Sequence, residues 1–315
     1  MNDRLKSLVI RISQLPLVKN ILQWSKRSSF PGFKGVPIYN VVKFFLREIQ
    51  RESLTIRSNS IAYSFFVALF PFIIFLITLV SFLQFRSVTE YLNTLHDSIG
   101  PVLPDSVDTF IFNDLINGIF TSQRGDLLSV GFVLALYFAS NGVMSLMMGF
   151  EKNYGEAYTS RNIFRKRLLA LGLTVVLGLM LFVGLSLILV SENLLGRMLE
   201  SVNLSGWTVD SILIFRWIVI LVLFYSVIAI IYRYGPNLKS KSAYFSPGAN
   251  IATVGIILTS IGFAYYLNRF GNYNAIYGSL GAIIITLLWI KINALVILIG
   301  YELNASIAVN KNLLD

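Results

Sequence analysis

Long uninterrupted runs of apolar residues dominate the chain. Six of them lie at about 61–83, 127–150, 168–190, 212–232, 249–267 and 276–301. An α-helix rises about 1.5 Å per residue, so about 20 apolar residues cross the hydrocarbon core of a bilayer. Each run is therefore long enough to form a transmembrane helix. The first three carry no formal charge, whereas the fourth contains Arg216 and the sixth contains Lys291.

The same pattern distinguishes the two architectures that can span a membrane. In lipid the backbone must satisfy its own hydrogen bonds, so only helices and closed barrels cross the hydrocarbon region. A β-barrel would contain segments of about ten residues with alternating polarity, and such segments do not appear in this sequence. The sequence predicts an all-α polytopic membrane protein with six transmembrane helices.

The distribution of Lys and Arg predicts how these helices are oriented. Of the 26 basic residues, 20 lie before the first run, in the second and fourth connections or in the tail, and four lie on the opposite side. Connections rich in Lys and Arg stay in the cytoplasm. We therefore expect a multi-pass protein with both termini in the cytoplasm.

The regions outside the runs have amphipathic or polar patterns. We expect a basic N-terminal segment at 1–56 with amphipathic helices on the inner interface, a six-helix domain at 57–305 and a cytoplasmic tail at 306–315. The external loop 86–126 is predicted to contain two short helices, because Gly100, Pro101 and Pro104 interrupt it. Its carboxylates match no metal-loop spacing, so we expect a solvated acidic face.

Composition agrees with this class and narrows the possible partners. The chain has 315 residues, of which 55% are hydrophobic and 13% charged, against about 25% charged in soluble domains. The net charge of +10 follows from the basic cytoplasmic face, which would attract anionic lipid head groups of the bilayer. Nothing in this pattern points to nucleic acid. No signal peptide is expected in the first 56 residues.

Enzyme chemistry has little support in the sequence. The chain has no cysteine and one histidine, His96, so thiolate sites and histidine clusters for metal binding are excluded. No Walker-type glycine loop is present. We expect no catalytic residues, no metal and no cofactor. An intramembrane enzyme would need an acid facing a base, for which Glu151 and Glu302 near the inner boundary are the available carboxylates.

Three of the spans carry small residues along one face. The second, fifth and sixth spans each repeat Gly, Ala, Ser, Thr or Asn at helical spacing. Such faces let helix backbones approach closely and usually form packing seams. A substrate path along the same faces is the alternative. We assign helix packing to Gly131, Ala135, Gly142, Gly255, Gly262 and Gly281.

Two charged residues lie within the spans. Lys291 is about 15 Å from the cytoplasmic end of its helix, where a charge is costly and a functional role is the default interpretation. Arg216 lies about one turn inside the outer boundary and is interpreted as an interfacial anchor.

Four stretches of the sequence resemble the YihY/BrkB family of bacterial inner-membrane proteins. They are Asn59–Phe75, Glu151–Leu171, Ile231–Ala249 and Tyr273–Ala305, and the last, YNAIYGSLGAIIITLLWIKINALVILIGYELNA, is the most specific. The resemblance implies a six-helix membrane protein described as transporter-like or as a virulence-associated factor. Lys291 departs from the family, in which an aromatic residue is expected.

The same family was formerly labelled ribonuclease BN, a tRNA-processing enzyme. Metal-dependent ribonucleases of that kind need clusters of histidine and aspartate, and the one histidine of this chain cannot supply them. We therefore expect no ribonuclease activity.

The sequence favours a transporter of a lipid or amphipathic solute. The chain has no motif for using ATP, so transport would need a gradient, a partner or a downhill substrate. A non-transporting membrane scaffold or envelope assembly factor explains the composition equally well. The residues expected to line a substrate path are Asn59, Tyr63, Asn141, Tyr277, Gly278, Asn293 and Glu302.

Overall fold

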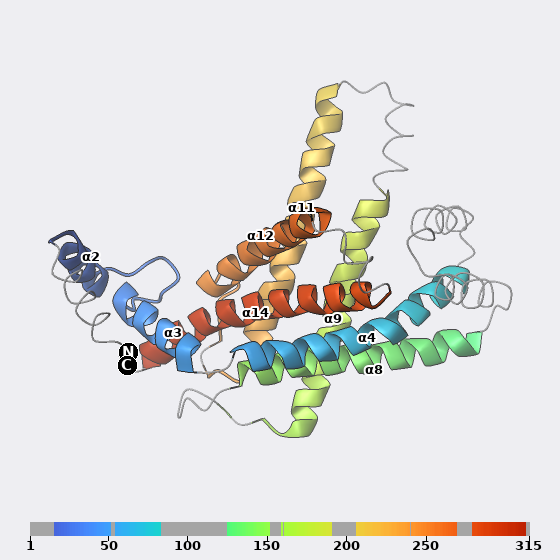
Figure 1. Cartoon of the computed structure of the whole chain (residues 1–315), viewed down its shortest axis with the longest axis horizontal. Helices are drawn as coiled ribbons and strands as arrows, with labels where there is room; N and C mark the ends of the chain where they lie inside the picture. Colours follow the sequence, from blue (N-terminus) through green and yellow to red (C-terminus); the bar gives the residue numbers. More distant parts are fainter. Residues whose placement is uncertain are drawn as a thin grey trace.

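The structure is a computed structural model that describes residues 16–51, 54–82, 125–151, 159, 161–190, 206–239, 241–269 and 279–312. Within these ranges the chain forms eight α-helices and no strand (Figure 1). The helices are α2 (Pro16–Arg27), α3 (Ile38–Arg51), α4 (Leu54–Phe82), α8 (Gly125–Phe150), α9 (Ile163–Val190), α11 (Gly206–Tyr234), α12 (Pro247–Arg269) and α14 (Ser279–Asn312).

Six of these helices confirm the predicted transmembrane spans. Helices α4, α8, α9, α11, α12 and α14 are each long and apolar enough to cross a membrane. Several of their ends extend beyond the apolar runs, because a helix can continue with polar residues where it leaves the hydrocarbon, whereas α8 and α9 end at the predicted residues Phe150 and Val190. Helix α4 starts at Leu54 rather than near residue 61, and α14 continues to Asn312 through most of the segment expected as a tail.

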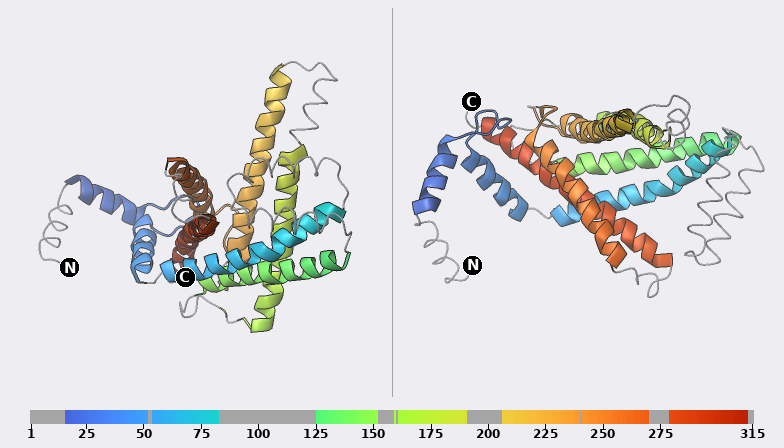
Figure 2. Two further views of the ribbon diagram at one scale, coloured as in Figure 1. Left: turned by 45° about the vertical axis from the view of Figure 1, so that its right-hand side comes forward. Right: turned by 90° about the horizontal axis from the view of Figure 1, so that it is seen from above.

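The long helices are arranged as two groups. Helices α4 and α8 lie side by side, and α14 packs on α4 with α12 along its other side (Figure 1; Figure 2). Helices α9 and α11 pack on each other and run across α8, which α9 contacts directly (Figure 1). The ends expected to be cytoplasmic therefore come together: α4, α9 and α12 begin there, and α8, α11 and α14 end there.

The best-packed core lies at this common end. Phe150 of α8, Tyr232 of α11 and Tyr301 of α14 are at most 1% exposed. The ring centres of Phe150 and Tyr301 are 4.3 Å apart, and those of Phe150 and Tyr232 are 5.9 Å apart. Offset and edge-to-face pairs of this kind add about 0.5–1.5 kcal/mol each to the burial of the rings. The core therefore joins α8, α11 and α14 through aromatic side chains.

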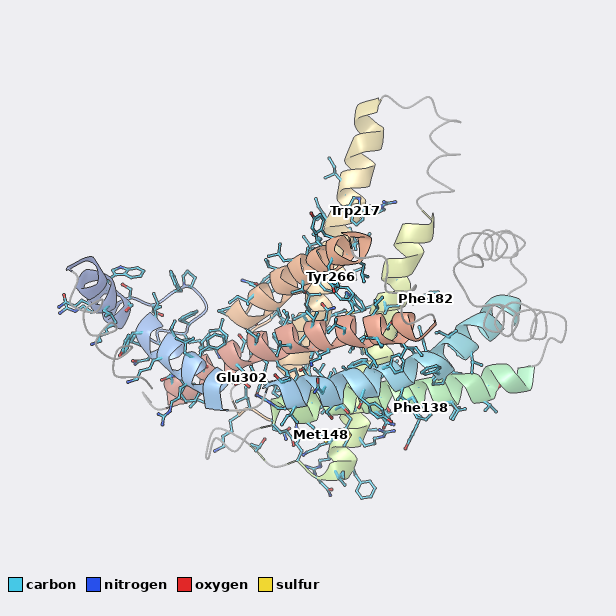
Figure 3. The ribbon with its side chains drawn as sticks, viewed as in Figure 1. Phe138, Met148, Phe182, Trp217, Tyr266 and Glu302 are labelled. Atoms are coloured by element: carbon cyan, nitrogen blue, oxygen red, sulfur yellow. The ribbon has the colours of Figure 1, made fainter. Side chains whose placement is uncertain are left out.

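Away from that end, the spans expose most of their apolar surface. Between 17% and 39% of the residues in each span's most apolar window are buried within the protein. Phe182 of α9 and Trp217 of α11 are 63% and 60% exposed (Figure 3). Water disfavours such a surface at about 25 cal/mol per Å², whereas lipid does not. The exposed faces fit a bilayer environment.

The N-terminal region folds onto the end of α14. Val36 and Val41 are fully buried and belong to a cluster that includes Leu303 and Ile307 of α14. Helix α3 confirms the predicted amphipathic helix. Part of its apolar face packs on α14, and another part of that face is exposed. The turn before it contains Gly32 and Gly35, both with positive φ.

Two of the predicted features lie largely outside the described residues. The external loop 86–126 is described only from Gly125, where α8 begins. The basic N-terminal stretch is described from Pro16, where α2 begins.

Candidate functional site

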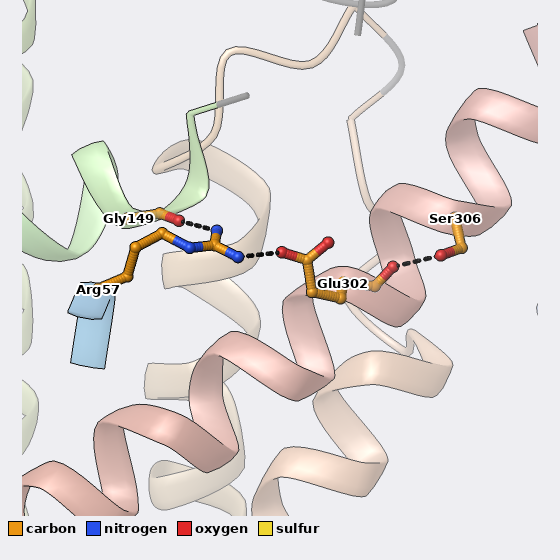
Figure 4. A network of polar contacts seen from close by, with 4 residues as sticks. All are labelled: Arg57, Gly149, Glu302 and Ser306. Carbon is orange, nitrogen blue, oxygen red and sulfur yellow. Dashed lines mark hydrogen bonds and ion pairs between the residues drawn. The ribbon is translucent and has the colours of Figure 1, made fainter. Parts of the chain in front are cut away.

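An ion pair between Arg57 and Glu302 lies at the common end of the helices. Arg57, in the first turn of α4, donates from Nη2 to Oε1 of Glu302 at 2.9 Å and from Nη1 to the carbonyl oxygen of Gly149 at 2.6 Å (Figure 4). The Glu302 side chain is fully buried and that of Arg57 is 15% exposed. A buried carboxylate is tolerated when it is paired and hydrogen-bonded. This contact joins α4, α8 and α14.

A second polar cluster joins the segments that follow α8 and α11. Glu151 accepts from Nζ of Lys166 at 2.7 Å and from Nδ2 of Asn237 at 2.9 Å. Arg161 donates to the carbonyl oxygens of three consecutive residues, 234–236, at 3.0–3.3 Å. Burial lowers the pKa of Arg161, and the nearby Glu151 partly opposes that effect. These contacts fix the segment before α9 against the end of α11.

Helices α12 and α14 cross at two glycines. A Cβ at Gly248 would lie 2.1 Å from the carbonyl oxygen of Gly300, and a Cβ at Gly300 would lie 2.6 Å from that of Gly248. The first N–H groups of a helix lack partners within it, and the N–H of Gly248 donates to Oδ1 of Asn304 at 2.9 Å. Nδ2 of Asn304 in turn donates to Oγ of Ser246 at 3.0 Å. Asn304 therefore caps α12 from α14.

The residues expected to pack helices lie in different surroundings. A Cβ at Gly142 would meet the ring of Phe65 at 3.1 Å, one at Gly255 would meet Val296 at 2.7 Å, and one at Gly131 would meet Phe75 at 3.6 Å. Ala135 and Gly281 are buried. A Cβ at Gly262 would meet nothing within 4 Å. Close approach is therefore observed along parts of these faces and is absent at Gly262.

An open cleft of about 600 Å³ lies between α4, α8 and the first turns of α9. We call it the Arg167 cleft. Its polar lining consists of Ser64, Asn141, Ser145 and Arg167. The rest of its lining is apolar or aromatic and comprises Tyr137, Met144, Met148, Ile163 and Phe164.

The guanidinium of Arg167 is the chemically distinctive group in the cleft. Its Nη1 donates to Oδ1 of Asn141, and its carbon Cζ lies 4.6 Å from the ring centre of Tyr137. Its Nη2 is buried and has no hydrogen-bond partner among the described residues. The hydroxyl oxygens of Ser64 and Ser145 are 2.7 Å apart in the same lining. The cleft thus combines a fixed cation with hydroxyl and amide groups.

The five described residues of the predicted substrate path do not gather in one place. Asn141 lines the Arg167 cleft, and Glu302 belongs to the ion pair with Arg57. Asn59 and Tyr63 are exposed on α4. Asn293 donates within its own helix to the carbonyl oxygen of Trp289 at 2.8 Å. Tyr277 and Gly278 lie outside the described residues.

The sequence interpretation did not single out Ser64 or Arg167 as site residues. Arg167 counted only as one positive charge of a basic connection, and Ser64 as part of an apolar span. The sequence shows that Arg167 lies near the start of a long helix. It does not show that Asn141 and Tyr137 lie beside it, because that contact depends on how the helices pack.

The two charged residues within the spans also have distinct settings. The guanidinium carbon of Arg216 lies 5.3 Å from the ring centre of Trp217, a contact of the cation–π kind. Lys291 is half-buried, with no hydrogen-bond or ion-pair partner in the part of the chain that the structure describes. Within that part, no three His, Cys, Asp or Glu side chains are grouped so as to hold a metal ion.

Comparison with known proteins assigns the chain to a family. The model of the family described as "Virulence factor BrkB" matches residues 45–314. The "Putative ribonuclease-like protein YfkH" of Bacillus subtilis is 31% identical over 260 residues, which cover 82% of this chain and 92% of that protein. A UPF0761 membrane protein of Alteromonas mediterranea is 27% identical, with 84% of this chain and 86% of that protein covered.

No solved structure matches the chain. The six apolar helices and the membrane proteins among its relatives make it a multi-pass membrane protein, and an inner-membrane location is consistent with this bacterial family. The match over residues 45–314 includes all six spans and the stretches in which the resemblance was first seen, so the chain belongs to the virulence factor BrkB family.

Proposed function

We propose that this protein moves a lipid or an amphipathic solute across the membrane by way of the Arg167 cleft. The observation that carries the proposal is the divided lining of that cleft. Arg167 and Asn141 form a polar part, whereas Met144, Met148 and Phe164 form an apolar part. Ligand sites of this size are usually apolar with a few placed polar groups. A molecule with a polar head and an apolar chain would use both parts.

The surroundings of the cleft support entry from the bilayer. Ile163 and Phe164, at its edge, are 64% and 79% exposed. Both belong to α9, whose remaining apolar surface is also largely exposed. A lipid chain can therefore approach the cleft sideways, without leaving an apolar environment.

The proposed orientation follows from the basic residues. We place the common end of the helices, and with it the Arg167 cleft, near the cytoplasmic face, since connections rich in Lys and Arg stay there. Anionic head groups of that leaflet are the expected partners of the exposed basic residues. The proposal involves no catalytic residue, metal, cofactor or nucleic acid, and no ribonuclease activity.

A membrane scaffold or envelope assembly factor is the second candidate. The observation that favours it is the tight common end, where the Arg57–Glu302 pair and the crossing of Gly248 and Gly300 fix four helices together. A scaffold needs such rigidity and needs no hydrated cleft. The two candidates therefore differ in whether water reaches Asn141.

Single-cysteine labelling tests this difference, because the chain has no cysteine of its own. Asn141→Cys is compared with three controls in sealed vesicles, using a membrane-impermeant thiol reagent from each side. Lys239→Cys is an exposed loop position, Leu181→Cys is exposed on a proposed lipid-facing surface, and Ala294→Cys is buried. The expected result is labelling of Asn141→Cys and Lys239→Cys from the same side, with Leu181→Cys and Ala294→Cys protected.

Protection of Asn141→Cys from both sides, with normal labelling of Lys239→Cys, would contradict the hydrated cleft and favour the scaffold. Movement itself is measured in proteoliposomes that contain a lipid fluorescently labelled on its head group. In protein-containing vesicles, external dithionite is expected to bleach probe that started in the inner leaflet as well as probe in the outer leaflet. Bleaching restricted to the outer leaflet would contradict lipid movement.

A further inference from the structure

We infer that the Arg167 cleft is selective for an anionic amphipath, whose phosphate or carboxylate head is bound by Arg167 while its apolar chain lies along Met144, Met148 and Phe164. This inference rests on the proposed function and names the chemical class of its ligand. It goes beyond the proposed function, because a cleft that accepts any lipid could also move lipids across the membrane.

The charges at the common end of the helices leave Arg167 without a carboxylate partner among the described residues. An arginine stays protonated in proteins. The two described carboxylates nearby are already engaged: Glu302 accepts from Arg57, and Glu151 accepts from Lys166, the residue next to Arg167. No carboxylate among the described residues pairs with Arg167. Its positive charge therefore remains available to a negative ligand.

The guanidinium of Arg167 uses only part of its hydrogen-bonding capacity within the described part of the protein. Nη1 is directed at Oδ1 of Asn141, whereas Nη2 is buried with no partner in the described part of the protein. Leaving a buried charged donor unsatisfied is unfavourable. A small turn of the guanidinium toward the cleft that Arg167 lines would bring Nη2 to its surface, where a carboxylate or phosphate oxygen would satisfy it with a charge-assisted bond.

Asn141 and Tyr137 hold the guanidinium of Arg167 in the lining of the cleft. Because Oδ1 of Asn141 accepts from Arg167, the amide orientation of Asn141 is set and its Nδ2 is left as a second donor. The ring of Tyr137 lies against the guanidinium at 4.6 Å and restricts its movement. Arg167 and Asn141 thus form a neighbouring pair of donors in the lining of the cleft.

The size and apolar walls of the cleft favour an amphipath over a free anion. A cleft of about 600 Å³ is far larger than a phosphate group and falls within the range of about 300–1,000 Å³ typical of sites for larger ligands. Met144 and Met148 supply flexible apolar walls that suit chains of variable shape. A free phosphate would leave these walls unused, whereas a lipid or fatty-acid anion would cover them.

The test measures binding of a short-chain fluorescent phosphatidylglycerol, and of phosphatidylcholine with the same chains, to the full-length protein in a neutral detergent. The wild type is expected to prefer phosphatidylglycerol by about tenfold, and Arg167→Gln is expected to remove that preference, since one charge-assisted bond corresponds to about a tenfold change in Kd. Arg165→Gln is the matched control, because it removes the same charge from an exposed position two residues away. That variant is expected to keep the preference.

Several outcomes would overturn the inference. One is equal binding of the two lipids by the wild type, and another is an equal loss in Arg165→Gln and Arg167→Gln, which would indicate a general effect of charge. Competition by inorganic phosphate as effective as that by unlabelled phosphatidylglycerol would contradict the amphipathic part. If Arg167→Gln fails to fold, Met148→Glu provides the second variant, since Met148 is 49% exposed and a carboxylate there would repel an anion. Because Met148 also belongs to the apolar wall, this variant is expected to weaken the binding of both lipids, and that of phosphatidylglycerol more, so that the preference for the anionic lipid falls.

The lipid-movement assay keeps the two proposals separable. Movement of phosphatidylcholine in proteoliposomes, together with no preference for phosphatidylglycerol, would overturn the anionic selectivity and leave the proposed function standing. Preferential binding of phosphatidylglycerol without movement of either lipid would support the anionic selectivity and overturn the proposed function.

Discussion

Arg57 and Glu302 form an ion pair of 2.9 Å between residues 245 positions apart in the sequence. Arg57 lies in the first turn of α4, and Glu302 lies on the buried part of α14. The guanidinium also donates to the carbonyl oxygen of Gly149 at the end of α8. One side chain therefore connects three transmembrane helices at the end where all six converge.

Removing one partner of this pair is expected to destabilise the protein. Arg57→Met leaves the fully buried Glu302 without this cation, and losses of about 3–5 kcal/mol are typical when a buried pair is broken. The double variant Arg57→Met/Glu302→Met is expected to recover part of the loss, because no unpaired charge remains. The free energy of unfolding in detergent measures both effects, with the exposed Arg47→Met as control. A loss in the double variant equal to the sum of the losses in Arg57→Met and Glu302→Met would contradict a direct coupling between the two side chains.

Substitution of the crossing glycines is expected to separate α12 from α14. Gly248→Ala places a methyl group 2.1 Å from the carbonyl oxygen of Gly300, an impossible contact without backbone movement. Overpacking of this kind costs about 1–3 kcal/mol or more. Gly262→Ala in the same helix has nothing within 4 Å and is expected to be neutral or stabilising by up to about 1 kcal/mol. Thermal unfolding in detergent compares the two, and equal effects would contradict the close crossing.

The two hydrogen bonds of Asn304 are expected to stabilise the start of α12. Asn304→Leu keeps a similar volume but leaves the N–H of Gly248 without its acceptor. An unsatisfied buried donor costs about 1–3 kcal/mol. Asn310→Leu is the control, since its amide bonds within its own helix to the carbonyl oxygen of Ser306. Increased hydrogen exchange at the start of α12 in Asn304→Leu, and not in Asn310→Leu, is the predicted result. Unchanged exchange would contradict capping across helices.

The proposed orientation can be tested separately. Lys239→Cys and His96→Cys are expected to react with an impermeant thiol reagent from opposite sides of the membrane, the first from the cytoplasm. Spheroplasts and inverted vesicles give access to the two sides. Reaction of both cysteines from the same side would overturn the orientation.

The number and type of the membrane helices were predictable from the sequence because they depend on local properties. A run of about 20 apolar residues must satisfy its backbone internally in lipid, whatever surrounds it. All six spans were found in this way, and several of their ends lie further out because polar residues continue the helix. The amphipathic helix α3 was also visible as a periodic pattern.

The contacts between helices could not be predicted from the sequence, because they join residues that lie far apart along the chain. Arg57 was one of eleven basic residues before the first span, and nothing nearby distinguished it as the partner of Glu302. Small faces were visible, yet Gly248 and Gly262 of the same helix α12 differ completely in what surrounds them. Helix rotation and crossing point decide such differences, and both are set by packing.

The sequence by itself determined that this protein lies in a bilayer as six helices, with the basic residues concentrated at one end of them. Only the tertiary structure decided which of those basic residues pair with carboxylates and which one lines a cleft. Hydropathy is a sum over neighbouring residues, whereas an ion pair or a cleft requires side chains of distant segments to meet at a few ångströms. Arg57, Lys166 and Arg167 therefore look alike in the sequence, and the packing of α4, α8, α9 and α14 makes them different.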